Sequence, residues 1–190
     1  MKKLVSVVAF FTLMFGIQSS TLAATSHTVT KGDTYWKIAS KYGVPVQKLM
    51  ASNNAKSSYL DIGQKVAVPA TTVTSAEKDL LARLVEAEAK GEPYAGKVAV
   101  ATVVLNRVDS DIFPNSIHAV IYQAGQFTPV SNGEINNPAS AESKHAVNEA
   151  IAFRGQGNGS LYFYNPSKTS NQWLRTKAVT TTIGNHVFAK

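Results

Sequence analysis

The stretch LLARLVEAEAKGEPY, residues 80–94, decides the fold of this chain. Leu81, Leu84 and Val85 follow the spacing i, i+3, i+4, so on a helix they form one apolar stripe. The next position on that stripe, i+7, is Glu88. A carboxylate therefore stands where a buried apolar residue is expected.

Signals on both sides of the stretch define a helix that ends near Glu88. Thr74 and Glu77 have the spacing of a capping box, and Lys90-Gly91 is a stop signal. Glu88 then lies in the last turn, where burial and the negative end of the helix dipole both disfavour an ionised carboxyl. The pattern predicts a raised pKa, which would let Glu88 donate a proton near neutral pH. Spacing alone leaves open the alternative that the stripe ends before Glu88, which is then solvated.

The composition is that of a folded protein with surplus positive charge. Of the 190 residues, 44% are hydrophobic, enough for a core in one large or two small domains, and the net charge is +7. An anionic cell-wall polymer suits this charge. Nucleic acid is not an expected partner, because no basic run with interleaved aromatic residues occurs. Cysteine is absent, which excludes disulfides, thiolate chemistry and cysteine-ligated metals.

Residues 1–24 have the pattern of a secretory signal peptide. Met1-Lys2-Lys3 precede an apolar run over residues 4–17 and a small-residue segment that ends at Ala24. Cleavage after Ala23 or Ala24 is expected and makes the mature protein a secreted one with a net charge of about +5. An uncleaved N-terminal anchor is the alternative. No other apolar stretch is long enough to cross a bilayer, so no stable membrane insertion is expected.

Residues 26–70 predict a small domain with the order strand, helix, helix, strand. Its most distinctive segments are HTVTKGDT (27–34), WKIA (36–39), Asn53-Asn54, LDIGQKV (60–66) and Val68-Pro69. Together they resemble a LysM module over its whole length. The resemblance implies a βααβ fold that binds glycans containing N-acetylglucosamine.

The LysM resemblance also implies which residues border the sugar groove, namely Gly32, Asp33, Thr34, Tyr35, Asp61, Ile62 and Gly63. Two loops rich in glycine, aspartate and backbone donors can hydrogen-bond acetamido groups while an apolar residue packs on the sugar face. For Gly32 and Gly63 the alternative is turn geometry at positive φ. Trp36 and Ile38 are expected in the core.

Residues 71–78 form a short linker and the start of the next helix, so the two domains are expected to lie close together. Residues 95–108 are apolar on nearly all sides, which predicts a central, buried helix. Arg107 near its end then needs a partner, for which Glu86, Glu88 and Glu92 are candidates. A close pair with Glu88 would keep that acid ionised.

The rest of the second domain, residues 79–190, changes from helix to strand along the chain. Residues 126–130 are expected to be extended, and residues 140–153 repeat apolar residues at helical spacing. Residues 161–164 predict a strand, and residues 180–188 predict a hairpin with a two-residue turn. Helices first and strands afterwards favour an α+β fold.

Several motifs of this domain stand out together: ARLV (82–85), EAKGEPY (88–94), GKVAV (96–100), VLNRV (104–108), Phe113-Pro114, Ile117, Val120-Ile121, Gln126-Phe127, YNP (164–166) and TIGNHVF (182–188). They resemble the SleB/CwlJ-type cell wall hydrolases, a family known from spore cortex-lytic enzymes. The resemblance implies a compact α+β domain related to lytic transglycosylases and lysozyme-like folds. It also implies that the catalytic acid is a glutamate at the end of the first helix, which is Glu88 here.

A single strong acid candidate favours a lytic transglycosylase acting on peptidoglycan glycan strands. Glu88 would protonate the glycosidic oxygen and then accept the proton of the sugar's own 6-hydroxyl, so that a 1,6-anhydro end forms. Hydrolysis would need a second carboxylate, with candidates Asp109, Asp111, Glu134, Glu142 and Glu149. The substrate-binding candidates are Gln126, Tyr164, Asn165 and Glu92.

Two alternatives belong to other classes. An N-acetylmuramoyl-L-alanine amidase generally needs zinc, but the four histidines include no HExxH motif, and His145 with Glu149 supplies two ligands at most. We therefore expect no metal and no cofactor. A non-catalytic wall-binding or coat-assembly protein is the other alternative, against which the intact motif around Glu88 argues. A wall-associated monomer is expected.

Overall fold

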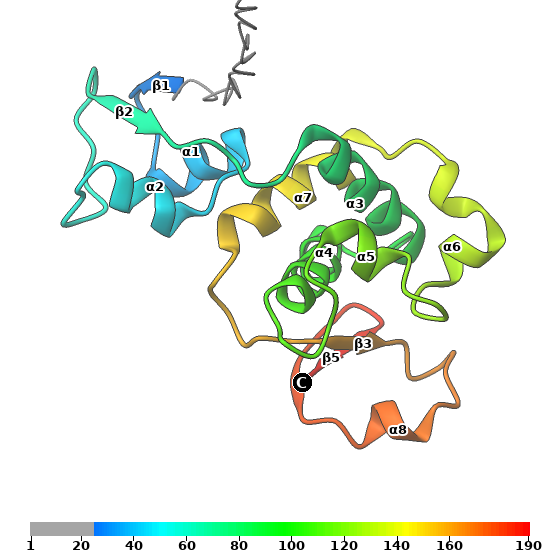
Figure 1. Cartoon of the computed structure of the whole chain (residues 1–190). Coiled ribbons are helices and arrows are strands. Elements are labelled where there is room, and N and C mark those ends of the chain that lie inside the picture. The colour runs from blue at the N-terminus through cyan, green and yellow to red at the C-terminus, as the bar shows by residue number, and fades with distance from the viewer. Residues whose placement is uncertain (1–24) are drawn as a thin grey trace, which may run out of the picture.

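The N-terminal domain has the predicted order of strand, helix, helix, strand (Figure 1). The computed structural model describes residues 25–190, so the predicted signal peptide, residues 1–24, lies outside the described residues. The elements are β1 (Thr25–Thr28), α1 (Tyr35–Tyr42), α2 (Val46–Ser52) and β2 (Lys65–Val68). β1 and β2 pair antiparallel, with His27 opposite Val66. The βααβ fold expected of a LysM domain is confirmed.

The second domain is an α+β unit, as the order of its sequence patterns predicts. Its elements are α3 (Ser75–Glu88), α4 (Tyr94–Val108), α5 (Ile117–Ile121), α6 (Thr128–Asn132), the 3-10 helix η1 (Glu134–Asn136), α7 (Ala141–Phe153), β3 (Tyr162–Tyr164), α8 (Gln172–Arg175), β4 (Val179–Ile183) and β5 (His186–Ala189). The three strands form an antiparallel sheet in the order β3-β5-β4. The sheet lies against α4, on the side away from α7 (Figure 1).

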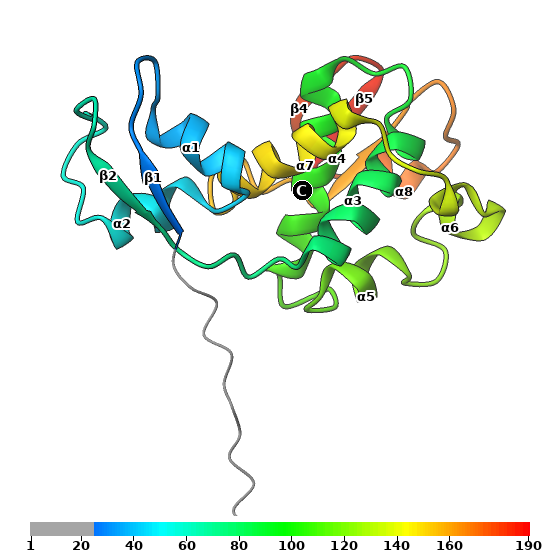
Figure 2. The same ribbon diagram turned by 90° about the horizontal axis from the view of Figure 1, so that it is seen from above.

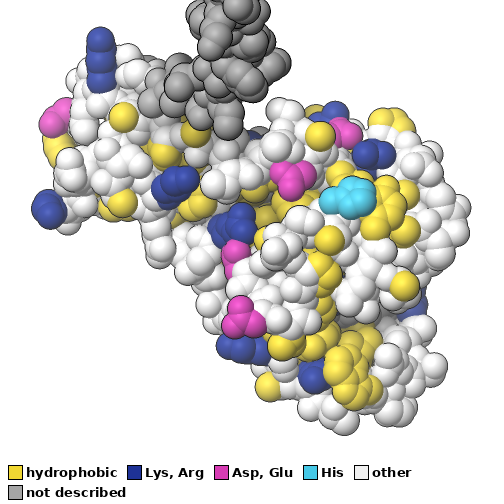
Figure 3. Space-filling view, viewed as in Figure 1, with side chains coloured by type: hydrophobic (Ala, Val, Ile, Leu, Met, Phe, Trp, Pro, Cys, Tyr) yellow, Lys and Arg dark blue, Asp and Glu magenta, His cyan; other side chains and the backbone are white. Residues whose placement is uncertain are grey.

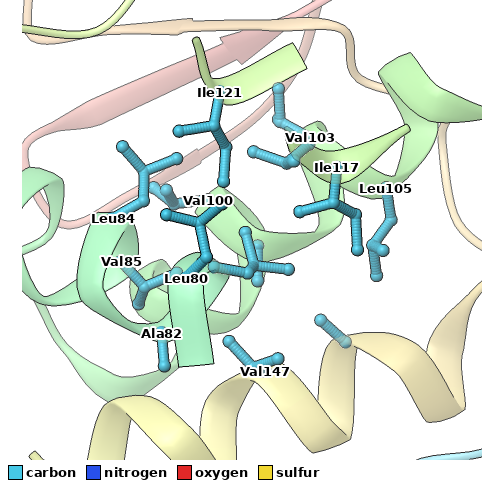
Figure 4. Packing of buried hydrophobic residues seen from close by; sticks show 14 of the residues in the cluster. Leu80, Ala82, Leu84, Val85, Val100, Val103, Leu105, Ile117, Ile121 and Val147 are labelled. Atoms are coloured by element: carbon cyan, nitrogen blue, oxygen red, sulfur yellow. The ribbon is translucent and has the colours of Figure 1, made fainter. Parts of the chain in front are cut away.

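Helix α3 begins and ends where its sequence signals predict. The Thr74 hydroxyl accepts from the Glu77 amide at 3.2 Å, and the Glu77 carboxylate accepts from the Thr74 amide at 2.9 Å, which closes the capping box. Leu81, Leu84 and Val85 are fully buried. Figure 4 shows Leu84 and Val85 packed with side chains of α4, α5 and α7. The last residue of the helix is Glu88.

Helix α4 is the central helix that its apolar sequence predicts. It packs against α3, α5 and α7 and against strand β3. Val100, Val103, Val104 and Leu105 are fully buried. Because α4 packs against α3 and against strand β3, it sets the distance between α3 and the sheet. The end of α3 and the sheet face each other across a cleft.

The prediction that residues 126–130 are extended is wrong for its second half. Residues 128–132 form the short helix α6, because Pro129 suits the first turn of a helix, and Gly133 ends it at φ 84°. Phe127, just before the helix, is buried in the core. The short helix α8 was also not expected from the sequence; the Asn171 side chain caps it by accepting from the Trp173 amide at 3.0 Å.

The two domains pack directly on each other through α1 and α7 (Figure 2). The rings of Trp36 and Phe153 meet edge to face at 6.0 Å, and Ala152 belongs to the core cluster of the LysM domain. In the linker, the Thr71 hydroxyl donates to the Gly43 carbonyl at 3.2 Å. These contacts hold the LysM domain in one orientation on the second domain. Trp36 therefore lies at the domain interface, at the edge of the LysM core.

Within residues 25–190, every helix is too short or too polar to cross a bilayer.

Candidate functional site

A cleft of about 580 Å³ opens where α3 ends. One wall comes from the end of α3 and the α6–η1 segment, and the other from β3, β5 and the loop that leads to α8. The lining residues are Ala87, Glu88, Arg107, Gln126, Phe127, Thr128, Pro129, Asn132, Glu134, Phe163, Tyr164, Asn165, Lys168, Thr169, Leu174 and His186. The cleft thus brings together residues that are up to about a hundred positions apart in the chain.

Glu88 lies half-buried in this cleft, as its position on the apolar stripe predicts. Burial and, to a smaller extent, the nearby charge of Glu134 raise the pKa of its carboxyl, while the charge of Arg107 opposes the rise, and the resulting pKa is about 7. No group among residues 25–190 donates a hydrogen bond to this carboxyl, so little stabilises its ionised form. The result is an acid that is about half protonated near neutral pH.

Glu134 is the one candidate second carboxylate that lines the cleft. It lies at the start of η1, and its side chain is exposed. The Arg83 guanidinium donates to the Ile135 carbonyl at 3.0 Å, which ties this segment to α3, the helix that also carries Glu88. The other four candidates lie elsewhere: Glu142 contacts Lys97, Glu149 accepts from Tyr94, Asp109 pairs with Arg154, and Asp111 is exposed outside the cleft.

Arg107 finds its partners in the wall of the cleft, and no carboxylate lies within ion-pair distance of it in the described chain. Its Nε donates to the Leu161 carbonyl at 2.8 Å, and its Nη1 donates to Gln126 Oε1 at 3.1 Å. The guanidinium lies over the rings of Phe113, Phe127 and Tyr162, 4.8–5.9 Å from their centroids. Burial lowers the pKa of Arg107 to about 10, so it stays charged at neutral pH. The close pair that would ionise Glu88 does not form.

Three of the four predicted substrate-binding residues line the cleft with Glu88. The Gln126 amide oxygen is held by Arg107, which leaves its NH₂ group for other partners. Tyr164 ends strand β3 on the opposite wall. Asn165 follows it, and its side chain accepts from the Ser167 amide at 2.9 Å, so it also shapes the turn after the strand.

The structure corrects the prediction that Glu92, the fourth candidate, is a substrate-binding residue, because Glu92 does not line the cleft. Its carboxylate accepts from the Asn185 amide at 2.9 Å and from the Asn185 side chain at 3.1 Å. Burial alone would raise the pKa of Glu92, but these hydrogen bonds lower it. Gly184 has φ 58°, and a Cβ there would lie 2.1 Å from the Glu92 carboxylate. Glu92 therefore holds the β4–β5 turn in place.

Glu86 points away from Glu88, onto the start of α7. Its carboxylate accepts from the Ser140 amide at 3.2 Å and from the Ser143 hydroxyl at 2.7 Å. The side-chain hydrogen bonds from Ser140 and Ser143 lower its pKa. Glu86 thus stabilises the N-terminus of α7, and the acidic residue that raises the pKa of Glu88 is Glu134.

Sequence reasoning missed several residues that line the cleft, among them Lys168 and His186. His186 was considered as a metal ligand and as part of the TIGNHVF motif but not as a cleft residue, because no pattern in the sequence connects the β5 strand with α3. Within residues 25–190, no three histidine, aspartate or glutamate side chains are grouped as a metal site requires.

The two LysM loops predicted to border a sugar groove lie side by side. The Gly63 amide donates to the Val29 carbonyl at 2.8 Å, and the Val29 amide donates to the Gln64 carbonyl at 2.9 Å. Ile62 is 73% exposed, so an apolar side chain is free to meet a sugar face. Gly32 and Gly63 have φ of 89° and 87°, a backbone conformation that favours glycine, so the turns require them. The space around both residues is open, which is also compatible with a groove.

Three other predicted groove residues have structural roles. The structure corrects the prediction that Tyr35 borders the sugar groove, because Tyr35 is only 4% exposed and belongs to the LysM core. The Asp33 carboxylate accepts from His27, from the Thr30 amide and from the Thr30 hydroxyl, and the His27 hydrogen bond lowers its pKa well below the usual range. The Thr34 hydroxyl caps α1. Asp61 is exposed in the second loop.

The surface charge is dispersed, as the sequence indicates. On the face shown in Figure 3, acidic and basic side chains are scattered over both domains and form no single patch. The charges that bear on the candidate site are those inside the cleft, where the cations Arg107 and Lys168 and the acids Glu88 and Glu134 lie together.

Comparison with protein families divides the chain in the same way as the structure. Residues 27–69 match the LysM domain, and residues 91–189 match the Cell Wall Hydrolase family. The second match covers the central helix α4, the α6–η1 segment, β3 and the β4–β5 hairpin. Glu88 lies three residues before the first matched residue, Gly91.

Curated relatives and solved structures agree with these matches. The spore cortex-lytic enzyme of Bacillus cereus is 33% identical over 178 residues, which are 93% of this chain and 68% of the relative. The Bacillus subtilis enzyme of the same name is 39% identical over 111 residues, 58% of this chain and 36% of the relative. The catalytic domain of the germination-specific lytic transglycosylase SleB from Bacillus anthracis is 36% identical. It superimposes with a TM-score of 0.60 over 64% of this chain and 99% of that domain. The chain therefore belongs to the cell wall hydrolase family and carries a LysM domain ahead of its hydrolase domain.

Proposed function

We propose that this protein is a secreted peptidoglycan-cleaving enzyme that binds wall glycan through its LysM domain. It acts as a lytic transglycosylase on the bond between N-acetylmuramic acid and N-acetylglucosamine. The observation that carries the proposal is the half-buried Glu88 carboxyl, with a pKa of about 7, in a cleft of about 580 Å³. The likeness to a domain described as a lytic transglycosylase supports the same reaction.

The reaction uses one carboxyl group twice. Protonated Glu88 donates its proton to the glycosidic oxygen as the bond from that oxygen to C1 of the muramic acid breaks, which gives an oxocarbenium-like centre. The 6-hydroxyl oxygen of the same sugar then bonds to C1, and its proton passes to the Glu88 carboxylate. The products are a 1,6-anhydromuramyl end and a free 4-hydroxyl, and Glu88 is again protonated. No water is consumed.

The pKa of Glu88 suits both steps. A general acid–base group works best when its pKa lies near the working pH, because a useful fraction is then protonated and the return of the proton is not strongly uphill. A glutamate at the ordinary value of 4.5 would be almost fully ionised at pH 7. Burial at the end of α3 therefore supplies the proton source.

The LysM domain adds a second, separate contact with the wall. Its exposed Gly32, Asp61 and Ile62 border the two adjoining loops, and N-acetylglucosamine-containing glycan is the proposed ligand. The direct packing of α1 on α7 means that a bound strand would be held at a set distance from the cleft. The proposed location is the cell wall or the spore cortex, in line with the names of the curated relatives.

Mass spectrometry of the products tests the proposed bond and reaction. The purified chain is incubated with peptidoglycan, and the soluble fragments are analysed. We expect fragments with 1,6-anhydromuramic ends. Reducing muramic ends would indicate hydrolysis, free stem peptides would indicate an amidase, and intact wall with bound protein would indicate a non-catalytic wall-binding protein.

Hydrolysis is the second candidate, because Glu134 lines the same cleft as Glu88. An inverting hydrolase places its second carboxylate on the opposite face of the sugar, where it activates a water molecule. Glu134 is exposed on η1, so water reaches it. Transglycosylation remains the better proposal, since Glu134 also accounts for part of the raised pKa of Glu88 without any direct role in the reaction.

Replacing Glu134 by glutamine separates the two candidates. Under the transglycosylase proposal, Glu134→Gln removes a negative charge that raises the pKa of Glu88, so the pKa falls. Because protonated Glu88 is the active form, the decline of the rate at alkaline pH then begins at lower pH. We expect a rate about 2–5-fold below wild type at pH 8 and nearly unchanged at pH 6.

The measurement is the pH–rate profile on soluble glycan strands, with Glu142→Gln as a control outside the cleft. A loss of more than about 100-fold at every pH would contradict transglycosylation and would identify Glu134 as the base of a hydrolase.

A further inference from the structure

His186 is a buried polar side chain in the wall of the cleft that the reaction described above does not use. It is the first residue of β5, the central strand of the sheet, and only 7% of its surface is exposed. Its ring packs against Phe163 at 5.3 Å and meets Phe188 edge to face at 6.2 Å. Two aromatic neighbours and the central strand therefore fix the orientation of the imidazole.

One ring nitrogen of His186 has no function in the fold. Nδ1 is completely enclosed and lacks a hydrogen-bond partner among residues 25–190. An enclosed polar atom without a partner costs folding free energy, and a phenylalanine in this apolar setting would avoid that cost. Packing alone thus gives no reason for a histidine at this position.

The surroundings determine which nitrogen carries the proton. Burial lowers the pKa of His186 and Lys168 lowers it too, whereas Glu92 opposes this, so the imidazole is neutral at neutral pH. A neutral imidazole has one N–H group. Enclosed N–H groups without an acceptor are rarer than enclosed acceptors without a donor. The proton therefore belongs on Nε2, the ring nitrogen that is not enclosed and that can meet a ligand in the cleft.

We propose that the Nε2–H group of His186 donates a hydrogen bond to an oxygen of the glycan in the cleft, either an acetamido carbonyl or a hydroxyl. The inference rests on the proposed function. Arg107 already donates to Leu161 and Gln126, so its donors are partly used by the protein. His186 adds a rigid, neutral donor on the wall opposite Glu88 and holds the sugar for proton transfer.

Two variants test this role by kinetics and melting temperature. His186→Phe keeps the ring packing and removes both nitrogens, so it should melt at or above the wild-type temperature while kcat/KM on soluble glycan falls about tenfold. In His186→Gln, the amide nitrogen takes the place of Nε2, so it should retain kcat/KM within about threefold. His118→Phe is the matched control, because His118 is exposed on α5 outside the cleft.

N-deacetylated glycan identifies the acceptor. If His186→Phe and wild type cleave it equally well, the acceptor is the acetamido carbonyl; if the tenfold difference persists, the acceptor is a hydroxyl. Wild-type kinetics for His186→Phe would overturn the proposal. So would a fall in its melting temperature of more than about 5 °C, or a loss in His186→Gln as large as that in His186→Phe.

The experiments distinguish failure of the proposed role of His186 from failure of the proposed glycan-cleaving function. If wild type releases no glycan fragments, the proposed function fails whatever the variants do. If wild type cleaves, Glu88→Gln does not, and His186→Phe equals wild type, then only the role of His186 fails.

Discussion

Replacing Glu88 by glutamine is expected to lower the rate of glycan cleavage by about 10²–10⁴-fold, the contribution of a positioned general acid–base group. The amide cannot donate the proton that the leaving oxygen needs, nor accept the proton of the 6-hydroxyl. Its shape is nearly that of the acid, so the cleft keeps its form. The variant should also be at least as stable as wild type above pH 7, because a half-buried carboxylate is no longer ionised there.

Clearing of a peptidoglycan suspension and mass spectrometry of the released fragments measure this loss. Glu86→Gln is the matched control, since it makes the same change two residues earlier on α3 and affects a carboxylate that contacts Ser140 and Ser143 outside the cleft. It should cleave within about threefold of wild type. Co-sedimentation with the wall should be unchanged in both variants, because the LysM domain is intact. Clearing by Glu88→Gln within tenfold of wild type would contradict the role of Glu88.

Truncating Leu84 to alanine should lower the free energy of unfolding by about 3 kcal/mol, within the 2–5 kcal/mol typical of a buried leucine. Leu84 lies one turn before Glu88 and is fully buried. Figure 4 shows it in the cluster formed by α3, α4 and α5. The change leaves a cavity beneath the end of α3, so both stability and the position of Glu88 suffer. Folded proteins typically have a free energy of unfolding of about 5–15 kcal/mol, so a loss of this size is a large fraction.

Urea or thermal unfolding measures the effect, which corresponds to a fall in Tm of about 6–12 °C for a chain of this size. Ile112→Ala is the control, because it removes a similar aliphatic group from a side chain that is 70% exposed. It should change the free energy of unfolding by less than about 0.5 kcal/mol. A loss below 1 kcal/mol for Leu84→Ala would mean that the stripe of α3 is not what stabilises this domain.

Elements whose signals lie within one or two helical turns could be predicted from the sequence. The capping box at Thr74 and Glu77 and the stop at Gly91 depend on neighbouring residues only, and the structure has α3 where they indicate. The same holds for the βααβ order of the LysM domain and for the β4–β5 hairpin. The short helix α6 was missed, because the signal of Pro129 and Gly133 spans only one turn and is equally compatible with a loop.

Residues whose role depends on distant partners could not be assigned in this way. Glu92 looked like a substrate-binding residue beside Glu88, but its partner is Asn185, 93 positions away. Tyr35 borders a groove loop in sequence and lies in the core in space. Glu134, as one of five acids outside any motif, was indistinguishable from the other four until the fold brought it to the cleft.

The sequence by itself determined that a capped amphipathic helix ends near Glu88, because helical periodicity and capping are properties of adjacent residues, but it left open whether that carboxyl is buried or solvated. Tertiary structure alone decided which groups line the cleft with that carboxyl, among them Glu134 from η1, Arg107 from α4 and His186 from β5. The pKa of about 7 follows from burial and from the charges of Glu134 and Arg107. Both burial and electrostatic interaction depend on distance in space, and only the packing of α3, α4 and the sheet sets those distances.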